Sequence, residues 1–316
     1  MAPQAAAASL PSIGEATASY EAWLGRRIAI VTADLAFKHE QMTVGSFPFL
    51  RSTFYRWAQV FPVRCPELRQ APQVLSVGDL HIENFGTWRD AEGRLIWGVN
   101  DFDETVVLPY TQDLVRLATS ALLAREQARM SLSGRRACAA ILEGYAESMR
   151  RGGGGAVLAE RYRWLRDLAI ARLKDQRPFW NHLQGLPDAP VHWQSRARRL
   201  LQAALPVRGL PVRFVQRQAG AGSLGRVRLV ALADWRGGMV AREAKPLAPS
   251  AWLWAQELPL VPPRYRELIA SAERVPDPFL SVHGKWLIRR LAPDSSRIEL
   301  ASLPRNRDED RLLWMM

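Results

Sequence analysis

The sequence is poor in cysteine and lysine, and it has no long apolar run. Only two of the 316 residues are cysteine, Cys65 and Cys138. Two thiols are too few for a disulfide framework or a thiolate zinc site, so we expect both to be buried and reduced. No segment approaches the roughly 18 apolar residues of a transmembrane helix, and residues 1–18 lack the basic start and apolar stretch of a secretory signal. These absences predict a cytoplasmic protein that does not contact a membrane.

The remaining composition is that of a globular protein, with 48% hydrophobic and 23% charged residues. Residues 1–18, rich in alanine, serine and proline, predict a flexible tail. Helical patterns dominate residues 19–205, whereas residues 206–316 contain apolar runs separated by glycine-rich turns. We therefore expect an α+β fold with a mainly helical lobe followed by a strand-rich lobe. Residues 311–316 are typical of the start of an apolar helix, which predicts a truncated C-terminus.

Positive charge is concentrated in one region of the chain. The net charge is +12, and residues 151–250 hold 18 basic and 6 acidic groups, whereas the flanking segments are nearly balanced. Such a field attracts phosphates, nucleotides or nucleic acid. Only four of the 43 basic residues are lysine, so a general preference for arginine on solvated helix faces explains the same excess. Nucleic-acid binding through residues 151–250 is therefore a less favoured alternative.

Candidate catalytic and metal-binding side chains are concentrated in two acidic loops. Residues 78–86 and residues 100–104 each follow a predicted strand, and a predicted hairpin between them brings the two loops together. Asp79 and Asn84 have the Asp-x-x-x-x-Asn spacing of a kinase catalytic loop, in which the aspartate accepts the substrate's hydroxyl proton and the asparagine binds a metal. The sequence therefore predicts Asp79 as the catalytic base.

The second loop contains Asp101-Phe102-Asp103, at the place where a kinase has its metal-binding Asp-Phe-Gly. Carboxylate and amide oxygens suit magnesium, so the predicted metal ligands are Asn84, Asp101 and Asp103. Four neighbouring residues are expected to organise the loops rather than react: His81, Glu83, Asp113 and Arg116. The alternatives are a turn aspartate at a helix cap for Asp79 and a solvated loop for Asp101 and Asp103.

A glycine loop follows much later in the chain. Residues 220–227 fit Gly-x-Gly-x-x-Gly-x-Val, and the apolar residues after the loop continue as a strand. A Rossmann site needs a helix there, so the kinase arrangement, in which a hairpin tip covers phosphates, fits better than a Rossmann turn; a plain glycine-rich hairpin stays an alternative. The predicted nucleotide-binding residues are Gly220, Gly222, Ser223 and Gly225, with Arg242 or Lys245 from a following strand. Because side chains alternate along a strand, only one of those two cations can face the nucleotide.

These motifs resemble the aminoglycoside and choline kinase branch of the protein-kinase-like fold. From about Lys38 to Leu313 the chain more closely resembles an uncharacterised bacterial family, domain of unknown function 2252. The matching stretches are residues 38–42, 47–51, 78–86, 100–104, 113–117 and 220–225. The family's Lys-Glu-Ala falls on Arg242, Glu243 and Ala244, so arginine replaces the family's lysine, and the two do not substitute freely at phosphates.

The order of the motifs is the reverse of that in kinases, because the glycine loop follows the catalytic loop. The sequence therefore predicts a protein-kinase-like two-lobed fold that is circularly permuted, which is tolerated where chain ends lie close together. The predicted activity is a phosphotransferase that uses magnesium and ATP and acts on an unknown acceptor. Two alternatives remain: a non-catalytic nucleotide- or anion-binding module that uses residues 151–250, and a metal-dependent phosphoesterase. The phosphoesterase would use Asp79, His81, Asn84, Asp101 and Asp103.

Overall fold

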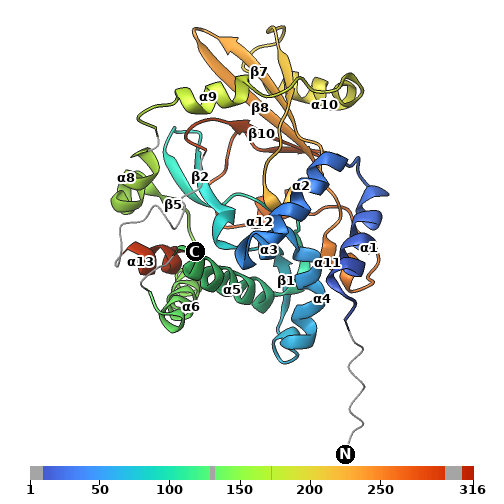
Figure 1. Cartoon of the computed structure of the whole chain (residues 1–316). Helices are drawn as coiled ribbons and strands as arrows, with labels where there is room; N and C mark the ends of the chain where they lie inside the picture. The colour runs from blue at the N-terminus through green and yellow to red at the C-terminus, as the bar shows by residue number, and fades with distance from the viewer. Residues whose placement is uncertain (1–9, 129–131, 172, 296–307) are drawn as a thin grey trace, which may run out of the picture.

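The computed structural model describes residues 10–128, 132–171, 173–295 and 308–316. The fold is α+β, as predicted (Figure 1). The helices are α1 (Ile13–Gly25), α2 (Thr32–Thr43), α3 (Ser46–Ser52), α4 (Phe54–Arg64), α5 (Tyr110–Ala128), α6 (Gly134–Arg150), α7 (Leu158–Arg161), α8 (Arg163–Ala171), α9 (Arg177–Gln184), α10 (Val191–Ala203), α11 (Ala251–Ala255), α12 (Tyr265–Ser271) and α13 (Asp308–Met315). The strands are β1 (Gln73–Ser76), β2 (Phe85–Arg89), β3 (Leu95–Val99), β4 (Val106–Pro109), β5 (Ala156–Val157), β6 (Arg213–Gln216), β7 (Leu229–Trp235), β8 (Gly238–Pro246), β9 (Ser281–His283) and β10 (Trp286–Leu291).

A five-stranded antiparallel sheet forms the upper part of the molecule in Figure 1, in the order β6-β7-β8-β10-β9. Apolar side chains of α10, including Ala197 and Leu201, form a buried cluster with Ala244 of β8 and Ile288 of β10. Successive side chains of a strand point to opposite faces. Glu243 and Lys245 therefore face away from α10, which directs two charged residues toward the rest of the molecule.

The helices before residue 205 pack with short sheets rather than with a single large sheet. Strands β2, β3 and β5 form one sheet, and β1 pairs with β4 in another. Buried residues of α5 and α6, such as Leu117 and Ile141, pack with Phe85 of β2 and Trp97 of β3. This core supports both acidic loops, because β1 leads into the first loop and β3 leads into the second.

Both ends of the described chain are helical. Helix α1 begins at Ile13, and Ser12 and Glu15 close its first turn by capping each other's backbone N–H groups. Residues 13–18 therefore belong to a helix, and the predicted tail over residues 1–18 is too long; residues 1–9 lie outside the described residues. The predicted terminal helix is α13, which packs on α6, with Leu312 and Leu313 buried.

Cys65 and Cys138 are free thiols, and both are half-buried rather than fully buried. Cys65 follows the end of α4, and Cys138 lies in α6. Of the helices that the structure describes, none is long and apolar enough to cross a membrane.

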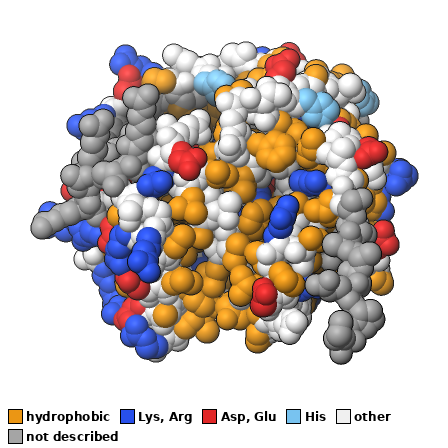
Figure 2. Space-filling view, turned by 60° about the horizontal axis from the view of Figure 1, so that its bottom comes forward, with side chains coloured by type: hydrophobic (Ala, Val, Ile, Leu, Met, Phe, Trp, Pro, Cys, Tyr) orange, Lys and Arg blue, Asp and Glu red, His pale blue; other side chains and the backbone are white. Residues whose placement is uncertain are grey.

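One face of the molecule is rich in exposed apolar side chains. Figure 2 shows them gathered on the side that is at the bottom of Figure 1. Exposed residues of the elements at this end include Val63 of α4, Val74 of β1 and Tyr145 of α6. Apolar patches of this kind promote association in solution.

Candidate functional site

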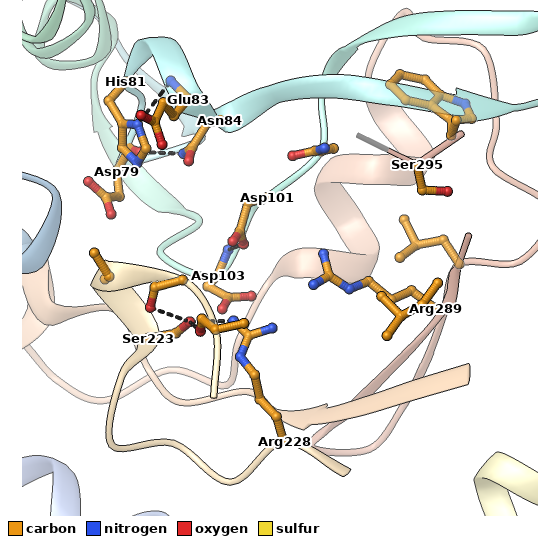
Figure 3. A pocket seen from close by; sticks show the side chains of 18 of the residues that line it. Asp79, His81, Glu83, Asn84, Asp101, Asp103, Ser223, Arg228, Arg289 and Ser295 are labelled. Atoms are coloured by element: carbon orange, nitrogen blue, oxygen red, sulfur yellow. Dashed lines mark hydrogen bonds between the residues drawn. The ribbon is translucent and has the colours of Figure 1, made fainter. Parts of the chain in front are cut away.

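The two acidic loops and the glycine loop line one cavity of about 390 Å³ (Figure 3). The first half of the chain supplies most of its acidic side chains, and the strand-rich half supplies most of its arginines. The residues that line it include Asp79, Asn84, Asp101, Gly222, Arg228 and Arg289. The structure thus brings together loops that are more than a hundred residues apart in the sequence.

The backbone before Asp79 is fixed by helix α5. Asp113 accepts hydrogen bonds from the N–H groups of Val77 and Gly78, at 2.8 and 3.0 Å. Gln112 donates from Nε2 to the carbonyl oxygen of Gly78 at 2.7 Å. Burial raises the pKa of Asp113 to about 7, although these backbone N–H groups favour its charged form. Asp113 is therefore a residue that positions the loop and does not face the cavity.

The carboxylate of Asp79 is paired with a fully buried arginine. Arg116 donates from Nε to Oδ1 of Asp79 at 2.7 Å, and from Nη2 to the carbonyl oxygen of Leu50 at 2.8 Å. Burial raises the pKa of Asp79 to about 7, against the opposing effect of Arg116. A carboxylate with a pKa near neutrality can exchange a proton at physiological pH, as a general base must.

The turn that follows Asp79 is held by hydrogen bonds between its own residues. Asn84 donates from Nδ2 to the carbonyl oxygen of Asp79 at 2.5 Å, which leaves its amide oxygen for another partner. The His81 ring is buried, and its Nδ1 accepts from the N–H of Glu83 at 3.2 Å. Glu83 forms an ion pair with Arg51 at 2.8 Å. His81 and Glu83 therefore hold the shape of the loop.

The two acidic loops touch at Gly78. This residue has φ of +86°, and a Cβ placed on it would collide with the carbonyl oxygen of Glu104. Only glycine tolerates both the left-handed backbone and this close approach. The β2–β3 hairpin adds a second link, because the N–H of Asn100 donates to the carbonyl oxygen of Asn84 at 2.9 Å. The predicted juxtaposition of Asp79 and Asp101 at one cavity is therefore present.

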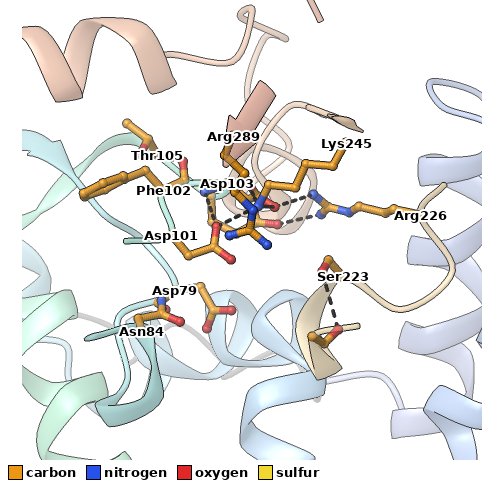
Figure 4. A network of polar contacts seen from close by, with 12 residues as sticks. Asp79, Asn84, Asp101, Phe102, Asp103, Thr105, Ser223, Arg226, Lys245 and Arg289 are labelled. Carbon is orange, nitrogen blue, oxygen red and sulfur yellow. Dashed lines mark hydrogen bonds and ion pairs between the residues drawn. The ribbon is translucent and has the colours of Figure 1, made fainter. Parts of the chain in front are cut away.

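A lysine from the five-stranded sheet reaches the second acidic loop (Figure 4). Nζ of Lys245 lies 3.1 Å from Oδ1 of Asp101 and 2.7 Å from Oδ1 of Asp103. Burial would raise the pKa of Asp101, but Lys245 and Arg289 outweigh it and hold the pKa well below its usual range. Asp101 is therefore ionised at every physiological pH, with a third of its side chain still exposed.

The glycine loop lies directly against Asp79. A Cβ placed on Gly222 would be 3.3 Å from Oδ2 of Asp79 and 2.9 Å from the carbonyl oxygen of Arg51. Gly220 and Gly225 have φ of +75° and +90°, which favour glycine. The hydroxyl group of Ser223 accepts a hydrogen bond from Nη2 of Arg228, so this arginine supports the glycine loop.

Arg242 is separated from the other predicted site residues. Its Nε donates to the carbonyl oxygen of Ala204, at the end of α10, at 2.9 Å, and its guanidinium lies 5.0 Å from the Phe279 ring centroid. It does not line the cavity that contains Asp79. Strand alternation places Lys245, three positions later, on the cavity side and Arg242 on the α10 side.

The metal-ligand predictions fit the structure unevenly. Among the residues that the structure describes, no group of three or more histidine, cysteine, aspartate or glutamate side chains is arranged to hold a metal ion. Asn84 and Asp101 both line the cavity with oxygen atoms suited to magnesium. Asp103 does not fit as well, because Lys245 contacts both of its carboxylate oxygens. A magnesium ion here would need phosphate oxygens or water for its remaining ligands.

A group of charged residues in the sheet was not predicted as part of the site. Glu243 is fully buried and pairs with three arginines. Burial would raise the pKa of Glu243, but these arginines outweigh it and hold the pKa well below its usual value. The three arginines, which all line the cavity, are Arg217, Arg228 and Arg289. The sequence signal was the positive excess of residues 151–250, which indicates charge but not its arrangement.

Comparison with known proteins supports the family resemblance. Residues 30–183 match the model of a family described as "Uncharacterized protein conserved in bacteria (DUF2252)". The match includes Asp79, Asn84 and Asp101, whereas the glycine loop and Lys245 lie beyond it. It is thus shorter than the predicted resemblance from about Lys38 to Leu313. No curated protein and no solved structure matches the chain.

Proposed function

We propose that this chain, a member of the DUF2252 family, is a kinase-like phosphotransferase that uses magnesium and ATP. The observation that carries the proposal is the contact of Lys245 with Asp101 beside a glycine loop that touches Asp79. A kinase needs these same elements: a lysine near the metal-binding aspartate, a glycine-rich cover for phosphates, and a catalytic aspartate opposite them. The acceptor of the phosphate is unknown.

The proposed roles follow from the contacts of each side chain. Asp79, with its pKa near 7, takes the proton from the acceptor's hydroxyl group. Arg116 positions this carboxylate and is itself held by the backbone of α3. Asn84 and Asp101 would hold a magnesium ion, which would supply positive charge next to the transferred phosphoryl group. Backbone N–H groups of the glycine loop cover the phosphates.

The proposed architecture is a circularly permuted kinase-like fold. In kinases the strands with the glycine loop and the lysine come first, whereas here β6, β7 and β8 follow the catalytic loop. Lys245 lies on β8, the second strand after the glycine loop, so the local order from glycine loop to lysine resembles that of kinases. The contact of Lys245 with Asp101 supports this proposal, because the two residues meet in space although their order along the chain differs from that in kinases.

One observation favours a non-catalytic binding module as a second candidate. The carboxylate of Asp79 is held by Arg116 and partly covered by Gly222, with 17% of its side chain exposed, so the glycine loop restricts the approach of an acceptor. A protein that binds a nucleotide without transferring its phosphate would tolerate such a closed arrangement. The metal-dependent phosphoesterase is less favoured, because Nδ1 of His81 accepts a hydrogen bond from the N–H of Glu83 in the same loop.

The decisive experiment combines binding with turnover. We expect isothermal titration to show ATP binding that strengthens when magnesium replaces EDTA, and a phosphate-release assay to show slow magnesium-dependent ATP hydrolysis. Binding without any turnover over a panel of hydroxyl-bearing acceptors would favour the binding module. A folded protein that binds ATP neither with nor without magnesium would exclude the proposed function.

A further inference from the structure

We propose that Arg217, Arg228 and Arg289, gathered around the buried Glu243, form a binding site for a diphosphate or triphosphate group. The inference deepens the proposed function, and it rests on that function only for the view that the bound group belongs to a nucleotide. The site itself follows from the charges and contacts of the described residues.

Glu243 organises the three guanidinium groups. Its Oε1 accepts from Nη1 of Arg217 at 2.7 Å. Its Oε2 accepts from Nη1 of Arg228 at 3.0 Å and from Nε of Arg289 at 2.7 Å. The carboxylate is completely buried, so the arginines are held in fixed positions instead of extending into solvent.

The sheet register explains why these residues meet. Glu243 of β8 is paired with Val230 of β7 on one side and with Arg289 of β10 on the other. Arg228 comes just before β7, and its carbonyl oxygen accepts from the N–H of Arg217 at 3.0 Å. Four separate segments thus direct their charged side chains to one face of the sheet, the face opposite α10.

The group has more positive than negative charge. Three guanidinium groups share a single carboxylate, which leaves an excess of +2. Asp101 and Asp103 act on Arg228, but Lys245 is paired with both of these carboxylates and Arg226 lies 3.7 Å from Asp103, so these neighbours do not cancel the excess. Each arginine is paired with the same single carboxylate, so the remaining positive charge favours an anion that enters the cavity.

Arg217 and Arg289 are exposed enough to contact such an anion, and Arg228 lines the same cavity. The side chains of Arg217 and Arg289 are 23% and 24% exposed, whereas that of Arg228 is 3% exposed. Nε of Arg217 and Nε of Arg228 are buried and have no hydrogen-bond partner among the described residues. Figure 3 shows the side chains of Arg228 and Arg289 pointing toward Asp101 and Asp103 in the centre of the view.

The neighbourhood favours a chain of phosphates over a single carboxylate. Guanidinium groups form paired hydrogen bonds to phosphate oxygens, and several of them suit a ligand with many oxygens. Arg228 also donates to Ser223 of the glycine loop, so the arginine group continues into the predicted phosphate cover. Arg242, which replaces the family's lysine, is not needed for this anchoring.

The test uses inorganic pyrophosphate as the probe, in EDTA, with the full chain. We expect isothermal titration to detect binding that Arg289→Gln and Arg217→Gln each weaken roughly 10- to 100-fold, the range for one charge-assisted hydrogen bond. Arg236→Gln is the matched control, because Arg236 is exposed in the turn between β7 and β8, and it should bind as the unmodified chain does. Circular dichroism establishes that each variant is folded. Two arginine variants are used so that the test can still be made if one of them does not fold.

Each outcome decides the proposal. Equal pyrophosphate binding by the unmodified chain and both variants, or no binding by the folded unmodified chain, would overturn it. Parallel titrations with ATP and AMP identify the source of the phosphates: a preference for ATP over AMP that disappears in Arg289→Gln assigns the site to a nucleotide. Pyrophosphate binding at the arginines without magnesium-dependent ATP turnover would retain this site and remove the phosphotransferase.

Discussion

Lys245 and Asp101 are 144 residues apart in the sequence and 3.1 Å apart in the structure, from Nζ to Oδ1. Lys245 belongs to the five-stranded sheet, and Asp101 to the loop after β3, so this contact joins the two halves of the chain at the cavity. Arg226, which donates from Nη2 to Oε1 of Glu104 at 3.0 Å, makes a second such link. Arg226 directly follows the glycine loop, so this second link lies beside it.

Lys245→Met and Arg242→Met form a matched pair on one strand. We expect Lys245→Met to weaken magnesium–ATP binding at least about tenfold and to lower the free energy of unfolding by about 1–3 kcal/mol, because it removes the buried cation that pairs with the partly exposed carboxylates of Asp101 and Asp103. Arg242→Met should bind ATP as the unmodified chain does, since Arg242 faces α10. Titration calorimetry and urea unfolding measure the two effects; equal losses of binding in both variants would contradict the assignment of Lys245.

Asp79→Asn should separate binding from chemistry. The amide cannot accept the acceptor's proton, so we expect turnover to fall by about 10²–10⁴-fold, the range of general-base catalysis. ATP affinity should change little, because Asp79 is proposed to act on the acceptor and not on the nucleotide. Steady-state kinetics and calorimetry on one preparation test this division. Loss of ATP binding in a folded Asp79→Asn variant would argue that Asp79 has another role.

The raised pKa of Asp79 predicts a pH profile. Below its pKa of about 7 the base is protonated, so the rate should fall roughly tenfold for each pH unit and level off above pH 7. The free energy of unfolding should change with pH in the opposite direction. Because the folded-state pKa of Asp79 lies above its unfolded value, the stabilising contribution of Asp79 is complete below about pH 4 and is lost as the pH rises through 7. The pKa of Asp113 is raised to a similar value, so Asp113 should change the free energy of unfolding in the same direction.

Rate and unfolding measurements between pH 5 and pH 9 test both signs. Asp113→Asn keeps Asp79 as the base, so its rate profile should retain the inflection near pH 7. A rate that does not vary across this range would exclude Asp79 as a base with a pKa near neutrality.

The sequence predicted the local elements of the fold better than their contacts. The β2–β3 hairpin and the strands around the glycine loop follow from alternation and turn residues, which are local signals. The start of α1 was predicted too late, because the alanine-rich composition concealed the capping pair of Ser12 and Glu15. A capping pair involves only two residues, so in the sequence alone it is weak evidence for the start of a helix.

The candidate site shows the same limit. Asp79, Asn84 and Asp101 could be selected from the sequence, because Asp79 and Asn84 have the spacing of a kinase catalytic loop and Asp101 lies in a second acidic motif that resembles the kinase metal-binding motif. The choice between Arg242 and Lys245 could not be made, because it depends on which face of β8 is covered by α10. Glu243 was overlooked as an organising residue, since its three arginine partners come from segments that are brought together only by the sheet.

Asp101→Asn should uncouple magnesium from nucleotide binding. The carboxylate of Asp101 is ionised and partly exposed, whereas an amide is a weaker ligand for magnesium. We expect ATP affinity in EDTA to be retained or slightly raised, and the gain on adding magnesium to be lost. Asp234→Asn, at an exposed position of β7, is the charge-matched control. A full magnesium effect in Asp101→Asn would assign the metal to other ligands.

Gly222→Ala tests whether the glycine loop must lie against Asp79. The added methyl group would be 2.9 Å from the backbone oxygen of Arg51 and 3.3 Å from Oδ2 of Asp79, so the loop must shift outward. We expect a loss of about 1–3 kcal/mol in the free energy of unfolding, as for overpacking elsewhere, together with weaker magnesium–ATP binding and lower turnover. Gly238→Ala is the control, since its methyl group meets no atom within 4 Å. Because neither glycine has a left-handed backbone, the two substitutions differ in contact rather than in backbone strain. Equal stability and equal ATP binding in both variants would show that the closed position of the loop over Asp79 is not required.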